Sequence, residues 1–321
     1  MISIVFVGRN DNYGGNFEER LLSTTRNNFA EFERRGIDAE LVFVEWNPIE
    51  DEPLLSLKVA EAIPRARCLV VDGALHDLIS ENRFIKVYEF HAKNIGVRHA
   101  RGDLLLLSNP DNFYGDDILD FLQRGEFDPQ TFYRAGWIDI ETAADVNRAD
   151  MNDHFAWNRP PYTGASGDFV LCAKTLFDRV DGYREDILFS NTHVDGILVQ
   201  AFYDITKRVS KIGHTYHLTH GREQQAKRRV KFEWKQVDRT PQRTYGFDSL
   251  LLETPLAPRI TRLSLPDPLA REARARAPVD PRVPAVYRPA PPGLRMLKRN
   301  FLQARYAISR LLNARPSAEE R

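Results

Sequence analysis

The sequence predicts an α/β protein built on a doubly wound, mostly parallel sheet. Short apolar runs rich in β-branched residues recur through residues 1–111, helical patterns separate them, and further apolar runs follow residue 130. Strands buried on both faces of a sheet read as continuous apolar runs, and the helices between them supply crossover connections. These observations favour one large α/β domain followed by a C-terminal extension.

The expected elements follow in order along the chain. A strand over 2–8 leads through a glycine-containing loop to a helix that Asn16 caps, with Glu19 placed to complete the capping box and Gly36 at its end. Further strands are expected over 39–44, 68–71 and 103–107, with helices near 53–62 and 90–101. Strands over 131–140, 168–172 and 209–218 complete the expected sheet, and a helix is expected over 194–203.

The C-terminal region differs in composition from the rest of the chain. Proline and arginine dominate residues 255–293, which predicts an extended linker. In the final segment, 294–321, apolar residues recur at alternating three- and four-residue spacing with basic flanks, which predicts an amphipathic helix over 294–313. Such a helix suits an anionic membrane surface, docking on the rest of the chain, or pairing in a homo-oligomer.

Charge and composition limit the classes of function. The formal net charge is zero, which argues against a dedicated nucleic-acid binder. Cys68 and Cys172 each lie in an apolar run, as expected of buried, reduced thiols in a cytosolic protein. Neither a leader peptide nor an apolar run of the roughly 20 residues that span a bilayer is evident. We therefore expect a cytoplasmic protein, with peripheral contact at the inner face of the membrane through residues 294–313.

Polar or acidic residues follow four of the predicted strands, at the point where each strand ends. They are Arg9 and Asp11, Glu45 and Asn47, Asp72, and Asn109 with Asp111. The carboxyl ends of parallel strands share one edge of a sheet, where open α/β folds bind ligands. Lys93 and Asn94 lie on the helix before the fourth strand, and a carboxylate near basic groups suits a divalent metal that holds a phosphorylated ligand. The sequence predicts a ligand site along this edge.

The stretch from Phe90 to Asp111 resembles a segment of GT-A glycosyltransferases. Its Ala92-Lys93-Asn94-Ile95-Gly96, followed by Gly102, an apolar strand and Asp111, is similar to the A-R-N-x-G…G-strand-x-x-D pattern of that fold, in particular of the family-2-like and exostosin-like groups. The resemblance covers roughly residues 1–225. It implies a GT-A catalytic domain over 1–254, with a nucleotide-binding half over 1–112 and an acceptor-side half over 113–254.

The resemblance also implies a reaction. Such an enzyme moves a sugar from a nucleoside-diphosphate sugar, here expected to be a UDP-sugar, to a glycan or lipid-linked acceptor in surface polysaccharide synthesis. The residues expected to bind the donor are Arg9, Asp11, Glu45, Asn47, Asp72, Lys93, Asn94, Asn109 and Arg222.

A metal site is implied by the same resemblance. Asp111 stands where the family's D-x-D element has its second carboxylate, while Asn109 replaces the first. His220, in His220-Gly221-Arg222, matches the histidine that commonly follows the family's last strand, and with His217 and Asp111 it is expected to hold Mn²⁺ or Mg²⁺. The alternative for the two histidines is that they are surface polar residues at a strand end. The alternative for Asp111 is a turn residue that caps a helix near Gly115.

Asp195 is the candidate catalytic base. It lies in Asn191-Thr192-His193-Val194-Asp195, where inverting GT-A enzymes carry an acid that takes the proton of the acceptor hydroxyl. In a retaining enzyme it would instead orient the sugar or the acceptor. The alternative from local structure is an N-cap for the helix that follows.

Two other functions fit the same features. A nucleotidyltransferase that makes nucleotide-sugars uses a related fold, although the chain has no G-x-G-x-R loop after the first strand. A non-catalytic glycan-binding or assembly protein would explain why Asn109 and Val194 stand where the family carries acids.

Overall fold

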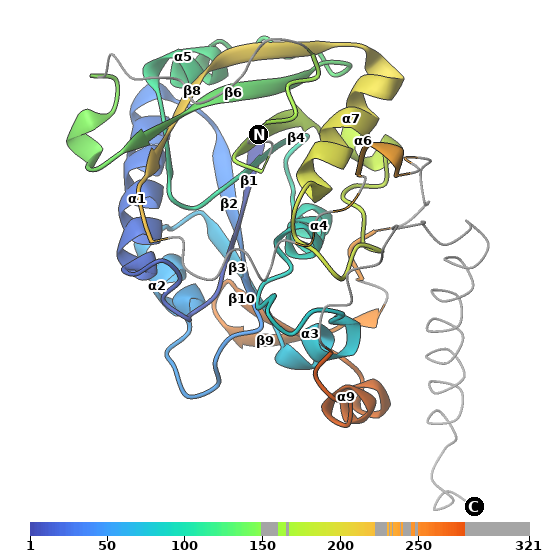
Figure 1. The fold of residues 1–321 in the computed structure, drawn as a ribbon. Helices are drawn as coiled ribbons and strands as arrows, with labels where there is room; N and C mark the ends of the chain where they lie inside the picture. Colours follow the sequence, from blue (N-terminus) through green and yellow to red (C-terminus); the bar gives the residue numbers. More distant parts are fainter. Residues whose placement is uncertain are drawn as a thin grey trace, which may run out of the picture.

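The computed structural model describes residues 1–148, 160–164, 167–221, 230, 232, 234–237, 239, 245–247 and 250–279 (Figure 1). These residues form an α/β structure around one ten-stranded sheet with the order β5-β8-β6-β7-β4-β1-β2-β3-β10-β9. The expected α/β class with a mostly parallel sheet is confirmed.

The first half of the sheet is parallel and follows the predicted alternation. Its strands are β1 (Ile2–Gly8), β2 (Ala39–Trp46), β3 (Ala66–Val71) and β4 (Leu104–Ser108), and parallel pairing joins β4, β1, β2 and β3 in that order. The connecting helices are α1 (Phe17–Arg35), α2 (Leu55–Ala62), α3 (Gly73–Ile79) and α4 (Glu89–His99).

The second half mixes strand directions. β7 (Phe169–Ala173) is antiparallel to both β4 and β6 (Phe132–Ile140), β8 (Val209–Leu218) is parallel to β6, and the short β5 (Asn112–Tyr114) is antiparallel to β8. Its helices are α5 (Asp116–Arg124), α6 (Lys174–Arg179) and α7 (Val194–Thr206), with single turns η1 (Ala143–Asp145) and η2 (Trp234–Gln236). These directions place the ends of β4, β6 and β8 and the start of β7 at one edge of the sheet.

Two apolar cores cover the two faces of the sheet. Alternate residues of β1 divide between them, because successive side chains of a strand point to opposite faces. Val5 and Val7 pack with α3, α4 and α7, whereas Ile4 and Phe6 pack with α1, α2 and α5. β1 is therefore buried on both sides, which is why its sequence shows no polar alternation.

The expected boundary of the linker is wrong for residues 255–274. β9 (Leu252–Ala257) and β10 (Ile260–Ser264) extend the sheet beyond β3, so β8 is not the last strand, and α9 (Asp267–Arg274) packs beside α3. Pro255 is compatible with β9 because that strand lies at the sheet edge, where a missing N–H group is tolerated. The helix expected over 294–313 lies outside the described residues.

The expected cap of α1 is also corrected. Asn16 adopts a left-handed conformation and makes no side-chain cap bond. Instead, Oδ1 of Asn12 accepts a hydrogen bond of 3.1 Å from the backbone N–H of Phe17. Among the helices of the described ranges, none is both long enough and apolar enough to cross a membrane.

Candidate metal centre and its surroundings

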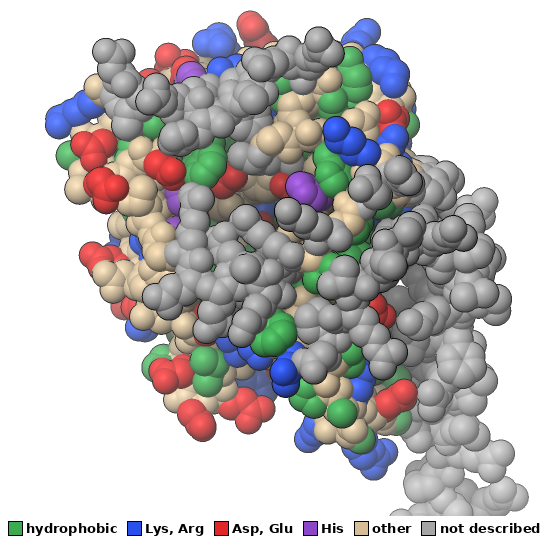
Figure 2. Space-filling model, in the orientation of Figure 1, with side chains coloured by type: hydrophobic (Ala, Val, Ile, Leu, Met, Phe, Trp, Pro, Cys, Tyr) green, Lys and Arg blue, Asp and Glu red, His purple; other side chains and the backbone are tan. Residues whose placement is uncertain are grey.

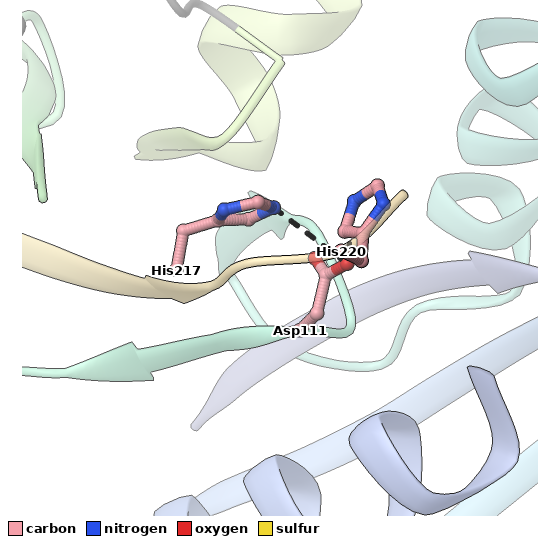
Figure 3. Close-up of side chains that lie close together, drawn as sticks. All are labelled: Asp111, His217 and His220. Carbon is pink, nitrogen blue, oxygen red and sulfur yellow. Dashed lines mark ion pairs between the residues drawn. The ribbon is translucent and has the colours of Figure 1, made fainter. Parts of the chain in front are cut away.

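Asp111, His217 and His220 converge at the edge of the sheet (Figure 3). Their candidate ligand atoms all lie within 4.8 Å of one another. The pairing of β5 with β8 sets this arrangement, since it places Asn112 opposite His217, and the backbone N–H of Leu218 donates to the carbonyl of Asp111 at 3.0 Å. Acidic and histidine side chains are visible near the middle of the face in Figure 2. The three predicted metal ligands are therefore brought together by strand register.

The two imidazole rings present the same atom to Asp111. Nε2 of His217 lies 3.7 Å and Nε2 of His220 lies 3.5 Å from Oδ2 of Asp111. The Nδ1 atoms face acceptors, namely Oδ1 of Asp139 at 2.8 Å from His217 and the carbonyl of Gly221 at 2.9 Å from His220. A carbonyl only accepts hydrogen bonds, so we assign the proton of His220 to Nδ1, which leaves a lone pair on Nε2.

The electrostatics of this cluster fit a divalent cation. Burial lowers the pKa of His220 and favours its neutral form. Asp111 and His217 are themselves buried. Two imidazole nitrogens and a carboxylate oxygen that face one another are donor types that suit Mn²⁺ and related metals.

The loop after β1 packs against this cluster. Gly14 has a φ of 69°, and a Cβ atom there would lie 2.5 Å from Nδ1 of His220. The N–H of Gly221 donates to the carbonyl of Gly14 at 3.2 Å, and the ring of Tyr13 meets the edge of His220. A glycine is required here both for the left-handed backbone and for the close approach.

Arg20 fixes this loop from the first turns of α1. Its guanidinium donates to the carbonyls of Tyr13, at 2.7 Å, and Gly15. The Nε atom lies 3.8 Å from Oδ2 of Asp111, is buried, and has no hydrogen-bond partner in the described part of the chain. Burial lowers the pKa of Arg20. The sequence analysis missed Arg20 because an arginine in a helical pattern resembles an ordinary surface residue.

The structure brings several of the predicted donor-binding residues together. Arg9 forms an ion pair of 2.8 Å with Asp11, and its Nε atom donates to the carbonyl of Asn47 at 2.6 Å. Asp72 lies 3.5 Å from Nε of Arg262, and burial raises the pKa of its carboxyl group. These residues line the carboxyl ends of β1, β2 and β3, as predicted.

Three predicted donor-binding residues have structural partners instead. Glu45 is fully buried, and its two oxygens accept hydrogen bonds from the N–H groups of Leu55 and Ser56, at the start of α2. Asn94 exchanges hydrogen bonds with the backbone of Tyr183. The ammonium of Lys93 is fully buried and uses its three donors on Glu89, Asn109 and Gly167. Direct nucleotide contact by these groups would break those bonds, and their part in donor binding stays a prediction.

Asn109 and Asp168 form a pair beside the metal cluster. Nδ2 of Asn109 donates to Oδ1 of Asp168 at 2.9 Å. Burial raises the pKa of Asp168 to about 6, and the charges of His217 and Asp111 act on it in opposite directions. The sequence analysis assigned residue 168 to a strand, whereas β7 begins at Phe169. An acidic residue directly before an apolar strand was the available signal.

Asp195 lies in the first turn of α7 near a second carboxylate. The residue at the N-cap position is His193, with a φ of 66°, so the capping alternative for Asp195 is wrong. A Cβ atom at Gly167 would lie 3.5 Å from Oδ2 of Asp195 and 3.9 Å from Oε1 of Glu89. Arg134, fully buried, is close enough for the charges of Asp195 and Asp168 to raise its pKa, although burial lowers that pKa to about 10 overall.

Two predictions remain, one for Asp111 as a helix cap and one for Arg222 as a donor-binding residue. The N-cap residue of α5 is Gly115, and no side chain caps that helix, so Asp111 does not act as its cap. Arg222 lies outside the described residues.

Comparisons with known proteins give structural matches only. No protein-family model matches the sequence, and no curated protein matches it. Residues 1–349 of S. aureus TarS align at 12% identity and a TM-score of 0.45, over 68% of this chain and 60% of that one. The mannosyltransferase PcManGT from Pyrobaculum calidifontis, in complex with GDP-Man and Mn²⁺, aligns at 14% identity and a TM-score of 0.44, over 69% and 58%.

The catalytic domain of Drosophila β1,4-galactosyltransferase 7, in complex with xylobiose, aligns at 14% identity and a TM-score of 0.45, over 82% of this chain and 92% of that one. The chain thus spans about three fifths of the TarS segment and of the mannosyltransferase.

Proposed function

We propose that this protein is a metal-dependent glycosyltransferase that takes a sugar from a nucleoside-diphosphate sugar. The observation that carries the proposal is the convergence of Nε2 of His217, Nε2 of His220 and Oδ2 of Asp111 at the sheet edge, beside the polar ends of β1 to β3. A carboxylate oxygen and two imidazole nitrogens next to a polar, glycine-containing loop suit a divalent cation that binds a diphosphate.

The donor would lie along the carboxyl ends of the parallel strands. Arg9, Asp11, Asn47 and Asp72, near the ends of β1, β2 and β3, would contact the nucleoside, and the backbone of the Tyr13–Gly15 loop lies next to the metal ligands. Arg20 holds this loop and adds a positive charge beside Asp111. A bound Mn²⁺ or Mg²⁺ would supply charge neutralisation for the departing diphosphate.

The acceptor would enter on the side of Asp195. The carboxylate of Asp195 can take the proton of an acceptor hydroxyl in an inverting reaction, or orient the sugar in a retaining one. We propose a UDP-sugar as the donor and a glycan or lipid-linked acceptor of surface polysaccharide synthesis as the substrate. Contact with a membrane, through residues 294–313, belongs to the same proposal.

The experiment that tests this function is thermal stabilisation by nucleoside diphosphates, with and without Mn²⁺. A ligand that binds only the folded state raises the midpoint by mass action. We expect UDP, or failing that GDP, to stabilise the wild type only with Mn²⁺, and Asp111→Asn to abolish that shift.

The matched control is Asp116→Asn, which removes an exposed carboxylate paired with Arg35 on α1, away from the metal cluster. This variant should keep the shift of the wild type. No shift with any nucleotide would contradict the proposal. A shift without sugar transfer would favour a glycan-binding protein, and formation of a nucleotide-sugar from a nucleoside triphosphate and a sugar 1-phosphate would favour a nucleotidyltransferase.

A further inference from the structure

Asp168 is held in place by the end of strand β4. The hydroxyl of Ser108 donates to its backbone carbonyl at 2.7 Å, and Nδ2 of Asn112 donates to the same carbonyl at 3.1 Å. Nδ2 of Asn109 donates to Oδ1 of its carboxylate at 2.9 Å. Three side chains from residues 108–112 thus fix both the backbone and the carboxylate of the residue directly before the neighbouring antiparallel strand β7.

The orientation of the Asn109 amide follows from a buried lysine. Nζ of Lys93 donates to Oδ1 of Asn109 at 3.2 Å, so the NH₂ group of that amide must face Asp168. Lys93 is fixed in turn by Glu89 at 2.6 Å and by the carbonyl of Gly167 at 3.0 Å. The other carboxylate oxygen of Asp168, Oδ2, makes no hydrogen bond to any residue in the described ranges. An oriented carboxylate therefore keeps one acceptor atom for a ligand.

Asp168 lies close to both the metal cluster and Asp195. Its partner Asn109 is two residues before Asp111, and the charges of His217 and Asp111 act on its carboxylate. The preceding residue, Gly167, lies beside Oδ2 of Asp195. With a diphosphate at the metal and an acceptor at Asp195, the group between them is the sugar being transferred.

We propose that Oδ2 of Asp168 accepts a hydrogen bond from a hydroxyl group of the donor's sugar and so selects which sugar is bound. This inference rests on the proposed function. A carboxylate accepts hydrogen bonds and donates none when ionised, so it suits a hydroxyl and disfavours a sugar that lacks one at that position. Asp168, oriented by Asn109, would thus supply a carboxylate just before β7, in place of the carboxylate that is missing at position 109 after β4.

Calorimetric titration in the presence of Mn²⁺ tests the proposal. UDP and UDP-glucose form one pair of probes, GDP and GDP-mannose a second pair, and the pair that binds the wild type is used. Asp168→Asn retains an oxygen that can accept from Asn109 but loses the charge. We expect it to weaken the sugar nucleotide about tenfold, the effect of losing one charge-assisted hydrogen bond, and the nucleoside diphosphate by less than about threefold.

The matched control is Glu40→Gln, which also neutralises a buried carboxylate that accepts two hydrogen bonds, from Ser3 and from the backbone N–H of Arg101, but lies at the start of β2, away from the carboxyl ends of the strands. It should bind both probes like the wild type. If Asp168→Asn does not fold, Asn109→Ala, which removes the hydrogen bond that orients Asp168, is used instead. It should also weaken the sugar nucleotide more than the nucleoside diphosphate, but by a smaller factor.

The outcomes separate the two proposals. Equal weakening of both probes would mean that Asp168 acts through the metal, and no weakening would mean that it is structural; either result overturns the inference. If the wild type binds no nucleotide with Mn²⁺, the proposed function itself fails. UDP-glucose analogues that each lack one sugar hydroxyl add a direct check. The analogue without the hydroxyl that contacts Asp168 should bind the wild type weakly, and Asp168→Asn should not weaken its binding further.

Discussion

The Nδ1 atom of His217 lies 2.8 Å from Oδ1 of Asp139. The two residues are directly opposite each other in the parallel pair of β6 and β8, so the contact is a product of strand register. A carboxylate behind a metal-ligating histidine fixes the tautomer, holds the ring plane and raises the basicity of the other nitrogen. Asp139 therefore directs the lone pair of Nε2 toward Asp111, and this relationship gives the first of four predictions.

Asp139→Asn should weaken Mn²⁺ binding by about 10- to 100-fold, because the ring of His217 loses its orienting charge. Titration of Mn²⁺ into the protein with saturating nucleoside diphosphate measures the effect. Asp117→Asn is the matched control, since Asp117 pairs with His214 of the same strand β8 at 3.1 Å, outside the metal cluster. Equal losses in the two variants would refute a role for Asp139 in the metal site.

Gly14→Ala should lower both stability and Mn²⁺ affinity. An alanine in the left-handed region costs about 1–2 kcal/mol, and its Cβ would lie 2.5 Å from Nδ1 of His220. Gly15→Ala separates the two effects, because Gly15 has a φ of 75° and no atom of the described residues lies within 4 Å of its Cβ position. Both variants should lower the free energy of unfolding, and only Gly14→Ala should weaken Mn²⁺ binding. A similar loss of Mn²⁺ affinity in both would show that loop strain, not contact with His220, matters.

Asp195→Asn should reduce sugar transfer by about 10²- to 10⁴-fold if Asp195 acts as a general base. Binding of the nucleoside diphosphate with Mn²⁺ should stay within error of the wild type, because the proposed donor phosphates lie at the other end of the site. Release of nucleoside diphosphate during turnover provides the assay. Asp204→Asn, on the same helix α7 and paired with Arg239, should behave like the wild type. Full activity in Asp195→Asn would remove this residue from the chemistry.

Acid should destabilise the protein through two buried histidines. Burial lowers the pKa of His76 and of His91 from 6.5 to about 4, so both are neutral in the folded state near pH 5. The unfolded chain takes up these protons first, so the free energy of unfolding falls as the pH decreases from about 6.5 to about 4. At pH 5 each histidine accounts for about 2 kcal/mol of that loss.

Urea unfolding at pH 7 and pH 5 checks this prediction. His91→Gln, which keeps a donor for the carbonyl of Glu185, should lose about 2 kcal/mol less than the wild type between the two pH values. The exposed His193, changed to Asn, is the control and should show the full loss. If His91→Gln loses as much as the wild type, His91 must already be protonated in the folded protein.

Local patterns predicted most of the sheet but not its far edge. Residues 2–8 were predicted as a strand because both faces of β1 are buried and every position is apolar or small. The residues of β9 are largely exposed and include Pro255, so nothing in their pattern distinguishes an edge strand from a linker. Likewise, the prediction that Asn16 caps α1 followed from residue type, whereas the conformation of the preceding loop gives that contact to Asn12.

The sequence by itself determined the α/β class, the strand ends that face the ligand edge, and the identity of Asp111, His217 and His220 as candidate ligands. It could do so because burial and periodicity are local properties, and because the motifs around the three candidate ligands resemble those of GT-A glycosyltransferases. Only the tertiary structure decided which polar groups remain available: Glu45, Asn94 and Lys93 are used internally, while Arg20, Asp139 and Asp168 come to the site. Hydrogen-bond partners far apart in sequence are set by strand register and packing, which no local pattern contains.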